Sequence, residues 1–172
     1  MRSTAFVTSI AIAGICALGA GSHARAEDCA RKIGERLPDI KGTDANDKAT
    51  TVRGGPGWLF VTVGASWCEP CAKELPAWDK VAPDYPKLTW VAIDISEKTA
   101  DGKAFHNKLG IKNLGRVYTR EANIGNLGSV MPSSYVVDPK GVIRFERCGF
   151  EKEGVDDEVK TMRAQLTKLL GP

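Results

Sequence analysis

The chain has 172 residues, with 24 Lys and Arg against 21 Asp and Glu, for a formal net charge of +3. Basic and acidic residues are interspersed, which disfavours a nucleic-acid binder, so we expect no nucleic-acid partner. The length fits one compact domain with its own hydrophobic core.

The N-terminal segment has the pattern of a secretory signal peptide. Arg2 precedes a largely apolar stretch over 5–20, and the Ala-Arg-Ala tripeptide at 24–26 forms a cleavage signal. We therefore expect residues 1–26 to be removed and residues 27–172 to form one domain. The alternative is an uncleaved membrane anchor, which the Ala- and Gly-rich composition of the stretch disfavours.

The rest of the chain alternates between predicted helices and strands. Continuous apolar runs indicate buried strands, and apolar residues spaced three and four apart indicate helices. In chain order we predict a helix over 28–37, polar turns to 57, a strand over 59–63, a helix over 70–85, a strand over 88–95, a helix over 99–109, strand 114–118, a short helix over 119–127, a hairpin of 134–137 with 142–147, and a final helix over 155–169. This order predicts an α/β fold with parallel central strands and an antiparallel hairpin.

A Cys-X-X-Cys pair, Cys68 and Cys71, lies at the predicted strand-to-helix junction. This position places the sulfur of Cys68 at a helix N-terminus, where unsatisfied N–H groups and the helix dipole favour a thiolate. A thiolate is the species that attacks disulfides, so the motif predicts a redox centre. Such a pair carries its own electrons, and we expect no cofactor.

Two other chemistries for the pair fit the sequence less well. A structural zinc site needs two more ligands, usually a second close pair, whereas Cys29 and Cys148 are single and far apart. We therefore expect no metal. A Cys–His hydrolase would depend on His106, which lies in an ordinary helical pattern.

The motif and its surroundings resemble a known family. The sequence Trp-Cys-Glu-Pro-Cys follows a strand, Glu74-Leu-Pro follows the cysteines, and Met131-Pro132 precedes Ser-Ser-Tyr-Val-Val-Asp-Pro-Lys-Gly. These features are similar to those of the thioredoxin superfamily, and within it to the exported TlpA/ResA-like thiol-disulfide oxidoreductases. The resemblance covers about 37–171. It implies a thioredoxin-like fold, with a mixed central sheet flanked by helices and the TlpA/ResA-type central insertion at 99–119.

The resemblance also implies roles for individual residues. Cys68 is expected to attack the substrate, and Cys71 to be the more buried resolving cysteine. Pro132 is expected to be a cis-proline beside the disulfide, and Glu74 an active-site acid. Glu74 lies three residues after Cys71, hence on the same side of the helix, where it would exchange a proton with that thiol.

Trp67, Glu69 and Met131 are expected to border the substrate groove. The charge of Glu69 disfavours a nearby thiolate, which favours a reductant over an oxidant, although glutamate also suits a helix first turn on its own. Met131 is either an apolar wall of the groove or, with the two cysteines, a Cu(I) ligand. The second interpretation leads to an alternative function, a copper-binding chaperone.

The sequence departs from the family pattern at two positions. Thr62 occupies the place of the buried aspartate of ordinary thioredoxin, which shifts the expected proton transfer towards Glu74. Val130 occupies the place of a glycine before the cis-proline, and Gly128 is the nearest glycine.

The remaining cysteines of the exported chain, Cys29 and Cys148, are left to pair with each other in an oxidising compartment. Such a disulfide would stabilise the domain by about 4–5 kcal/mol in the chain-entropy model. The alternatives are two free thiols, or a relay that exchanges with Cys68.

The sequence thus predicts a monomeric periplasmic enzyme that reduces disulfides of selected exported proteins. The resemblance suggests cytochrome c maturation or copper-oxidase assembly as substrate classes, and a membrane thiol carrier as electron donor. A disulfide oxidase or isomerase is the alternative direction of the same chemistry.

Overall fold

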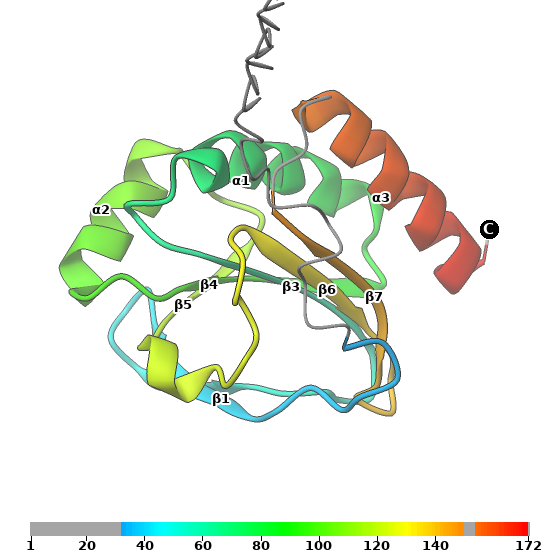
Figure 1. Cartoon of the computed structure of the whole chain (residues 1–172), viewed down its shortest axis with the longest axis horizontal. Helices are drawn as coiled ribbons and strands as arrows, with labels where there is room; N and C mark the ends of the chain where they lie inside the picture. Colours follow the sequence, from blue (N-terminus) through cyan, green and yellow to red (C-terminus); the bar gives the residue numbers. More distant parts are fainter. Residues whose placement is uncertain (1–31, 150–153, 172) are drawn as a thin grey trace, which may run out of the picture.

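The computed structural model describes residues 32–149 and 154–171. Its strands and helices follow the alternating order that the sequence predicts, with α-helices α1 to α3 and short 3₁₀ turns η2 and η3 (Figure 1). They are β1 (Ile40–Asp44), β2 (Ala49–Val52), β3 (Trp58–Gly64), α1 (Glu69–Val81), η2 (Ala82–Asp84), β4 (Leu88–Asp94), α2 (Thr99–Lys108), β5 (Gly115–Tyr118), η3 (Glu121–Asn123), β6 (Ser133–Val137), β7 (Ile143–Cys148) and α3 (Val155–Leu170).

The strands form one mixed sheet in the order β2-β1-β5-β4-β3-β6-β7. The central strands β3, β4 and β5 are parallel, whereas β6 and β7 are antiparallel to their neighbours. The predicted mixed α/β sheet is therefore confirmed. The segment expected to be the insertion folds as α2 and β5, and β5 extends the parallel part of the sheet.

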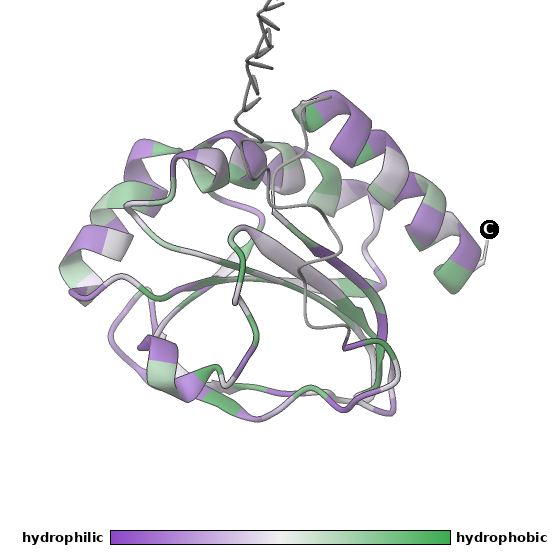
Figure 2. Cartoon of the chain, in the orientation of Figure 1, coloured by the Kyte–Doolittle hydropathy of each residue, from purple (hydrophilic) through white to green (hydrophobic). Residues whose placement is uncertain are grey.

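Apolar side chains pack on both faces of the sheet. Helices α1 and α3 cover one face, where Trp78 and Met162 are fully buried against Phe60 and other strand residues. On the opposite face, Val61 belongs to a second core cluster that includes residues of β1 and β2, at the edge of the sheet, and Ile124, directly after η3 (Figure 1). The hydropathy colouring shows hydrophilic and hydrophobic segments alternating along α3 (Figure 2), and its buried residues include Met162 and Leu166. The apolar residues of α3 pack against those of α1, which holds α3 beside the helix that begins at the cysteines.

The N-terminal part of the domain differs from the prediction. Residues 32–37 form a turn and a bridge to Val142 instead of the end of a helix, and residues 28–31 lie outside the described part. The reason is that this backbone pairs with the chain around β7: Gly34 N–H donates to Ile143 O, and Leu37 N–H to Gly141 O, both at 2.9 Å. The polar stretch before β3, predicted as turns, contains the antiparallel hairpin β1–β2.

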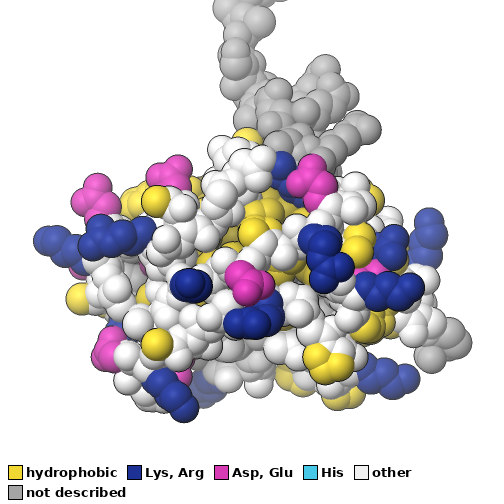
Figure 3. All heavy atoms as spheres, turned by 90° about the horizontal axis from the view of Figure 1, so that it is seen from below, with side chains coloured by type: hydrophobic (Ala, Val, Ile, Leu, Met, Phe, Trp, Pro, Cys, Tyr) yellow, Lys and Arg dark blue, Asp and Glu magenta, His cyan; other side chains and the backbone are white. Residues whose placement is uncertain are grey.

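The predicted short helix over 119–127 is reduced to the 3₁₀ turn η3, and the helix over 70–85 ends as α1 at Val81, followed by η2. Among the described residues, no helix is long and apolar enough to cross a membrane. On the face opposite the helices, Lys and Arg side chains are scattered among acidic and hydrophobic ones (Figure 3).

Candidate active site

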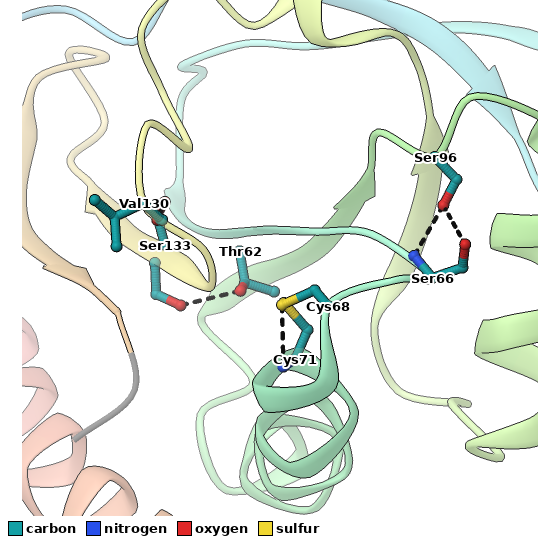
Figure 4. The surroundings of a disulfide bond; sticks show 8 residues. Thr62, Ser66, Cys68, Cys71, Ser96, Val130 and Ser133 are labelled. Atoms are coloured by element: carbon teal, nitrogen blue, oxygen red, sulfur yellow. Dashed lines mark hydrogen bonds between the residues drawn. A yellow bond between two sulfur atoms is a disulfide. The ribbon is translucent and has the colours of Figure 1, made fainter. Parts of the chain in front are cut away.

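Cys68 and Cys71 form a disulfide where β3 leads into α1, with their Cα atoms 5.3 Å apart (Figure 4). Cys68 is 5% exposed and Cys71 is fully buried, so the sulfur nearer to solvent is that of Cys68. Cys71 is thus the more buried of the two, as expected, and the attacking and resolving roles stay a prediction. Gly64, the last residue of β3, makes room for the pair, because a β-carbon there would lie only 3.1 Å from Cys71 Sγ.

Cys68 is the N-cap of α1, and its Sγ accepts a hydrogen bond from Cys71 N–H at 3.2 Å. When the disulfide is reduced, the same N–H and the positive end of the helix dipole stabilise a thiolate on Cys68. Pro70 lies in the first turn of the helix, where its missing N–H costs nothing. The local sequence therefore places backbone groups that favour a thiolate around Cys68.

Glu69, between the two cysteines, faces solvent with a side chain that is 82% exposed. It forms an ion pair with Lys73 one turn later, at 2.9 Å, and this hydrogen bond and charge lower the pKa of Glu69. Lys73 partly offsets the negative charge that Glu69 adds near the sulfurs. Glu69 therefore favours a reductant less strongly than the sequence predicts.

Glu74 lies one turn beyond Cys71 and is only 1% exposed. Burial, together with the nearby carboxylate of Glu158, raises the pKa of Glu74 to about 8, although the Trp78 indole and the Arg147 guanidinium act in the opposite direction. Neither Glu74 Oε2 nor Trp78 Nε1 has a hydrogen-bond partner among the described residues. Glu74 is thus a buried acid with a free oxygen, unlike the solvated glutamate that is usual on a helix.

The neighbours that tune Glu74 come from β7 and α3. Glu158 of α3 is 1% exposed, and its Oε1 accepts a hydrogen bond from Arg147 Nη2 at 2.6 Å. Sequence reasoning missed this buried ion pair. The acidic first turn of α3 was visible in the sequence, and the spacing of Glu158 four and eight residues before Met162 and Leu166 was the signal that it faces inward.

The loop before β6 contains the expected cis peptide bond between Met131 and Pro132, and Pro132 is buried. Two hydrogen bonds hold this loop: Ser133 Oγ donates to Val130 O at 2.7 Å, and Gly149 N–H donates to Pro132 O at 2.8 Å. Figure 4 shows Val130 and Ser133 on the side of the disulfide opposite Ser66 and Ser96. The role of Pro132 in guiding a substrate backbone remains a prediction.

The other two residues predicted for the groove differ in exposure. Trp67 is 64% exposed beside Cys68, which makes it one of the most exposed large apolar residues in the described part. Met131 is half-buried and packs against the core on the β1–β2 side of the sheet. This packing supports the apolar-wall interpretation of Met131.

The two departures from the family pattern have local explanations. Thr62 is buried, and its Oγ1 accepts a hydrogen bond from Ser134 Oγ at 3.0 Å, so β3 and β6 satisfy a polar pair where a carboxylate was expected. Gly128 takes the positive φ of 74° in the loop, and a β-carbon there would press on Val63 at 3.0 Å. The glycine needed for the loop is therefore two residues before Val130.

His106 is buried in α2, and its Nδ1 lies 3.3 Å from the Tyr118 hydroxyl. Burial and the charge of Arg116 lower the pKa of His106 to about 4. It packs beside Tyr118 and is not among the groups at the disulfide. Cys148 is buried at the end of β7, whereas Cys29 lies outside the described residues, so their pairing stays a prediction.

A family model described as the AhpC/TSA family matches residues 33–146, about two thirds of the chain. The chain belongs to the AhpC/TSA family. Among curated relatives, the thiol-disulfide oxidoreductase ResA of Bacillus thuringiensis (strain Al Hakam) is 28% identical over 134 residues, which cover 75% of this chain and 78% of that protein. A thioredoxin-like protein of Bacillus subtilis, YneN, is 25% identical over 121 residues, or 67% of this chain and 71% of that one.

Solved structures show the same fold. A DsbE-type thiol:disulfide interchange protein from Chlorobium tepidum has a TM-score of 0.69 at 20% identity, over 81% of this chain and 98% of that one. A secreted Mycobacterium tuberculosis disulfide oxidoreductase has a TM-score of 0.55 at 15% identity, over 71% and 95%. The predicted thioredoxin-like fold and family resemblance are confirmed. The family and the named relatives, with the paired cysteines, assign redox enzyme activity by thiol–disulfide exchange.

Proposed function

We propose that this protein is an exported, periplasmic enzyme that reduces disulfide bonds in selected exported proteins. One observation carries the proposal: an N-capping Cys68 is joined to a buried Cys71, and the buried acid Glu74 lies one helical turn behind. A nucleophile near the surface, a resolving thiol and a proton acceptor are the three groups that disulfide reduction by exchange requires.

In the proposed cycle the reduced enzyme begins with a Cys68 thiolate. Its sulfur attacks one sulfur of the substrate disulfide, the substrate S–S bond breaks, and the released substrate thiolate takes a proton. The mixed disulfide is then attacked by the Cys71 sulfur, whose proton passes to Glu74. The bond from Cys68 to the substrate breaks, the second substrate sulfur leaves as a thiolate and takes a proton from water, and two electrons have moved to the substrate. The enzyme ends as the Cys68–Cys71 disulfide.

The proton affinity of Glu74 suits this role. Its pKa of about 8 lies near the ordinary range of thiols, which makes Glu74 a much stronger base towards a thiol proton than an ordinary carboxylate. A carboxylate with an ordinary pKa near 4 would be a weak base for a buried thiol. Glu74 also returns the proton when the disulfide is reduced again by the electron donor.

The compartment, the substrates and the donor follow from the resemblance and the N-terminal pattern. We propose that residues 1–26 are a cleaved signal peptide, which places a monomeric domain of 27–172 in the periplasm; the name of the secreted Mycobacterium tuberculosis protein supports an exported location. Proteins of cytochrome c maturation or copper-oxidase assembly are the proposed substrates, and a membrane thiol carrier is the proposed donor. We also propose that Cys29 and Cys148 form a structural disulfide, which mass mapping of the unreduced protein would test by the fragment that joins them.

Trapping of the mixed disulfide tests the proposed reaction. Reduced C71S protein, mixed with an oxidised protein such as insulin, should accumulate a covalent complex through Cys68 that dithiothreitol releases. Reduced C68S protein, the matched control, should accumulate far less, because Cys71 is buried. Equal trapping by both variants, or by neither, would contradict the assigned roles.

A further inference from the structure

The turn that leads into the nucleophile is held from outside the cysteine motif. Residues 65–68 form a tight turn in which Cys68 N–H donates to Ala65 O at 3.0 Å. Ala65 is fully buried, whereas Trp67 at the tip of the turn is 64% exposed. Whatever fixes this turn therefore fixes both the direction of Trp67 and the start of α1 at Cys68.

Ser96, just after β4, makes two hydrogen bonds to this turn. Its Oγ accepts from Ser66 N–H at 2.9 Å and donates to Ser66 Oγ at 2.9 Å (Figure 4). We call this pair of contacts the Ser66–Ser96 clamp. A backbone hydrogen bond lies next to the clamp: Ile95 N–H, directly after β4, donates to the carbonyl oxygen of Gly64 at 3.0 Å, just before the turn. The clamp thus extends the parallel β3–β4 pairing beyond the last strand residues.

A buried carboxylate anchors the clamp. Asp94 is 1% exposed, and its Oδ1 accepts from Ser96 N–H at 2.9 Å. Helix α2 lies directly against Asp94, because a β-carbon at Gly102 would overlap the carboxylate. Ser96 itself is 4% exposed. The hydroxyl that holds the turn is therefore fixed by the β4 end and by α2, and is not a mobile surface group.

We infer that Ser96 is a positioning residue for disulfide exchange with protein substrates, holding Trp67 outward as a rigid contact surface beside Cys68. This rests on the proposed function. Ser96 is nearly buried, so it acts through Ser66. A rigid tryptophan loses little freedom when a protein substrate covers it, whereas one on a loosened turn must be ordered at binding. A small disulfide needs access only to the Cys68 sulfur and gains little from Trp67.

The test compares two oxidised substrates, insulin and glutathione disulfide, with wild-type enzyme and Ser96→Ala, and dithiothreitol regenerates the reduced Cys68–Cys71 pair after each turnover. We expect kcat/KM for insulin to fall about three- to tenfold, mainly through a higher KM, with less than about a twofold change for glutathione disulfide. Ser66→Ala keeps the backbone bond to Ser96 and should have a smaller effect, about twofold on the same ratio. The double variant should be no worse than Ser96→Ala, because both changes disrupt one clamp.

Thr119→Ala is the matched control. It removes a hydroxyl that donates to Lys41 O at 2.6 Å, outside the clamp, and should leave the insulin-to-glutathione ratio unchanged. Should Ser96→Ala fail to fold, Ser66→Ala carries the test at a half-buried position. An unchanged ratio in the folded serine variants would overturn the inference. Wild-type protein inactive on both substrates would instead overturn the proposed function.

Discussion

Two glutamates on helix α1, five residues apart, are in opposite electrostatic states. Glu69 faces solvent, pairs with Lys73 and has a lowered pKa. Glu74 lies under α3, is 1% exposed and has a pKa raised to about 8. The residue type is the same and both lie within one helical turn of a cysteine along α1, so the difference comes from what packs over each side of the helix.

This comparison separates two effects on the same pair of sulfurs. Glu69 acts only as a charge, which water and Lys73 screen. Glu74 changes its protonation state in the pH range where thiols ionise, so it can accept or return a proton during the exchange. We therefore expect large effects from changes at Glu74 and small ones from changes at Glu69.

The largest expected effect is on the rate of exchange. Glu74→Gln should slow the resolution of the mixed disulfide by about a hundredfold, because the buried proton acceptor is lost. Glu69→Gln, the matched change on the exposed side, should alter the rate less than about twofold. Rapid-mixing measurements on the reduced enzymes would give both numbers, and equal slowing in the two variants would break the comparison.

The pH dependence of this step sharpens the same prediction. In the wild type, the resolution rate should rise with pH and reach half its maximum near pH 8, where Glu74 loses its proton. In Glu74→Gln the rise near pH 8 should be absent, and the resolution rate should follow the ionisation of Cys71 alone. Unchanged cysteine titration curves in the variant would remove Glu74 from the mechanism.

The second effect is on the stability of the oxidised protein, in which Cys68 and Cys71 do not titrate. Glu74 has a folded-state pKa of about 8 against an ordinary 4.5, so the folded state holds the proton more tightly. Its favourable contribution is complete below pH 4.5 and is lost as the pH rises to 8. Between pH 5 and 8.5 the wild type should lose roughly 4 kcal/mol relative to Glu74→Gln. Denaturant unfolding of both oxidised proteins measures this difference in the free energy of unfolding. Parallel pH profiles of that free energy in the two proteins would show that Glu74 is not a perturbed acid.

The smallest effect is expected at the exposed ion pair. Lys73→Met removes the cation that partly offsets Glu69, which disfavours the Cys68 thiolate. The reduction potential of the pair should become more negative by less than about 10 mV, because the charges are solvent-exposed. Equilibration with a glutathione redox buffer measures this shift. A shift towards a stronger oxidant would reverse the sign of the argument.

Features that depend on short stretches of the chain could be predicted from the sequence. The strand β3, the helix start at Cys68 and the hairpin β6–β7 follow from local patterns: an apolar run, a Cys-X-X-Cys junction and an Asp-Pro-Lys-Gly turn. The burial of Glu74 was not readable, because it depends on α3, more than eighty residues later, and on the Arg147–Glu158 pair that α3 completes. Local pattern gives the position of Glu74 on the helix, and long-range packing gives its pKa.

The hairpin β1–β2 was missed for a related reason. Its strands are short, Thr-rich and half-exposed, so neither an apolar run nor a clear alternation marks them. The turn between them had a signal in Asp44, whose Oδ1 accepts from the N–H groups of Asn46 and Lys48. The Ser66–Ser96 clamp had no signal at all, since it joins two serines thirty residues apart.

The reduction potential of the Cys68–Cys71 pair tests the central claim, that this site reduces the disulfides of other proteins. Equilibration of the full domain with glutathione buffers, read by mass change after thiol alkylation, gives the value directly. The account predicts a potential near that of thioredoxin, about −270 mV. A value near −120 mV, typical of a strong oxidant, would contradict it and assign the site to disulfide formation.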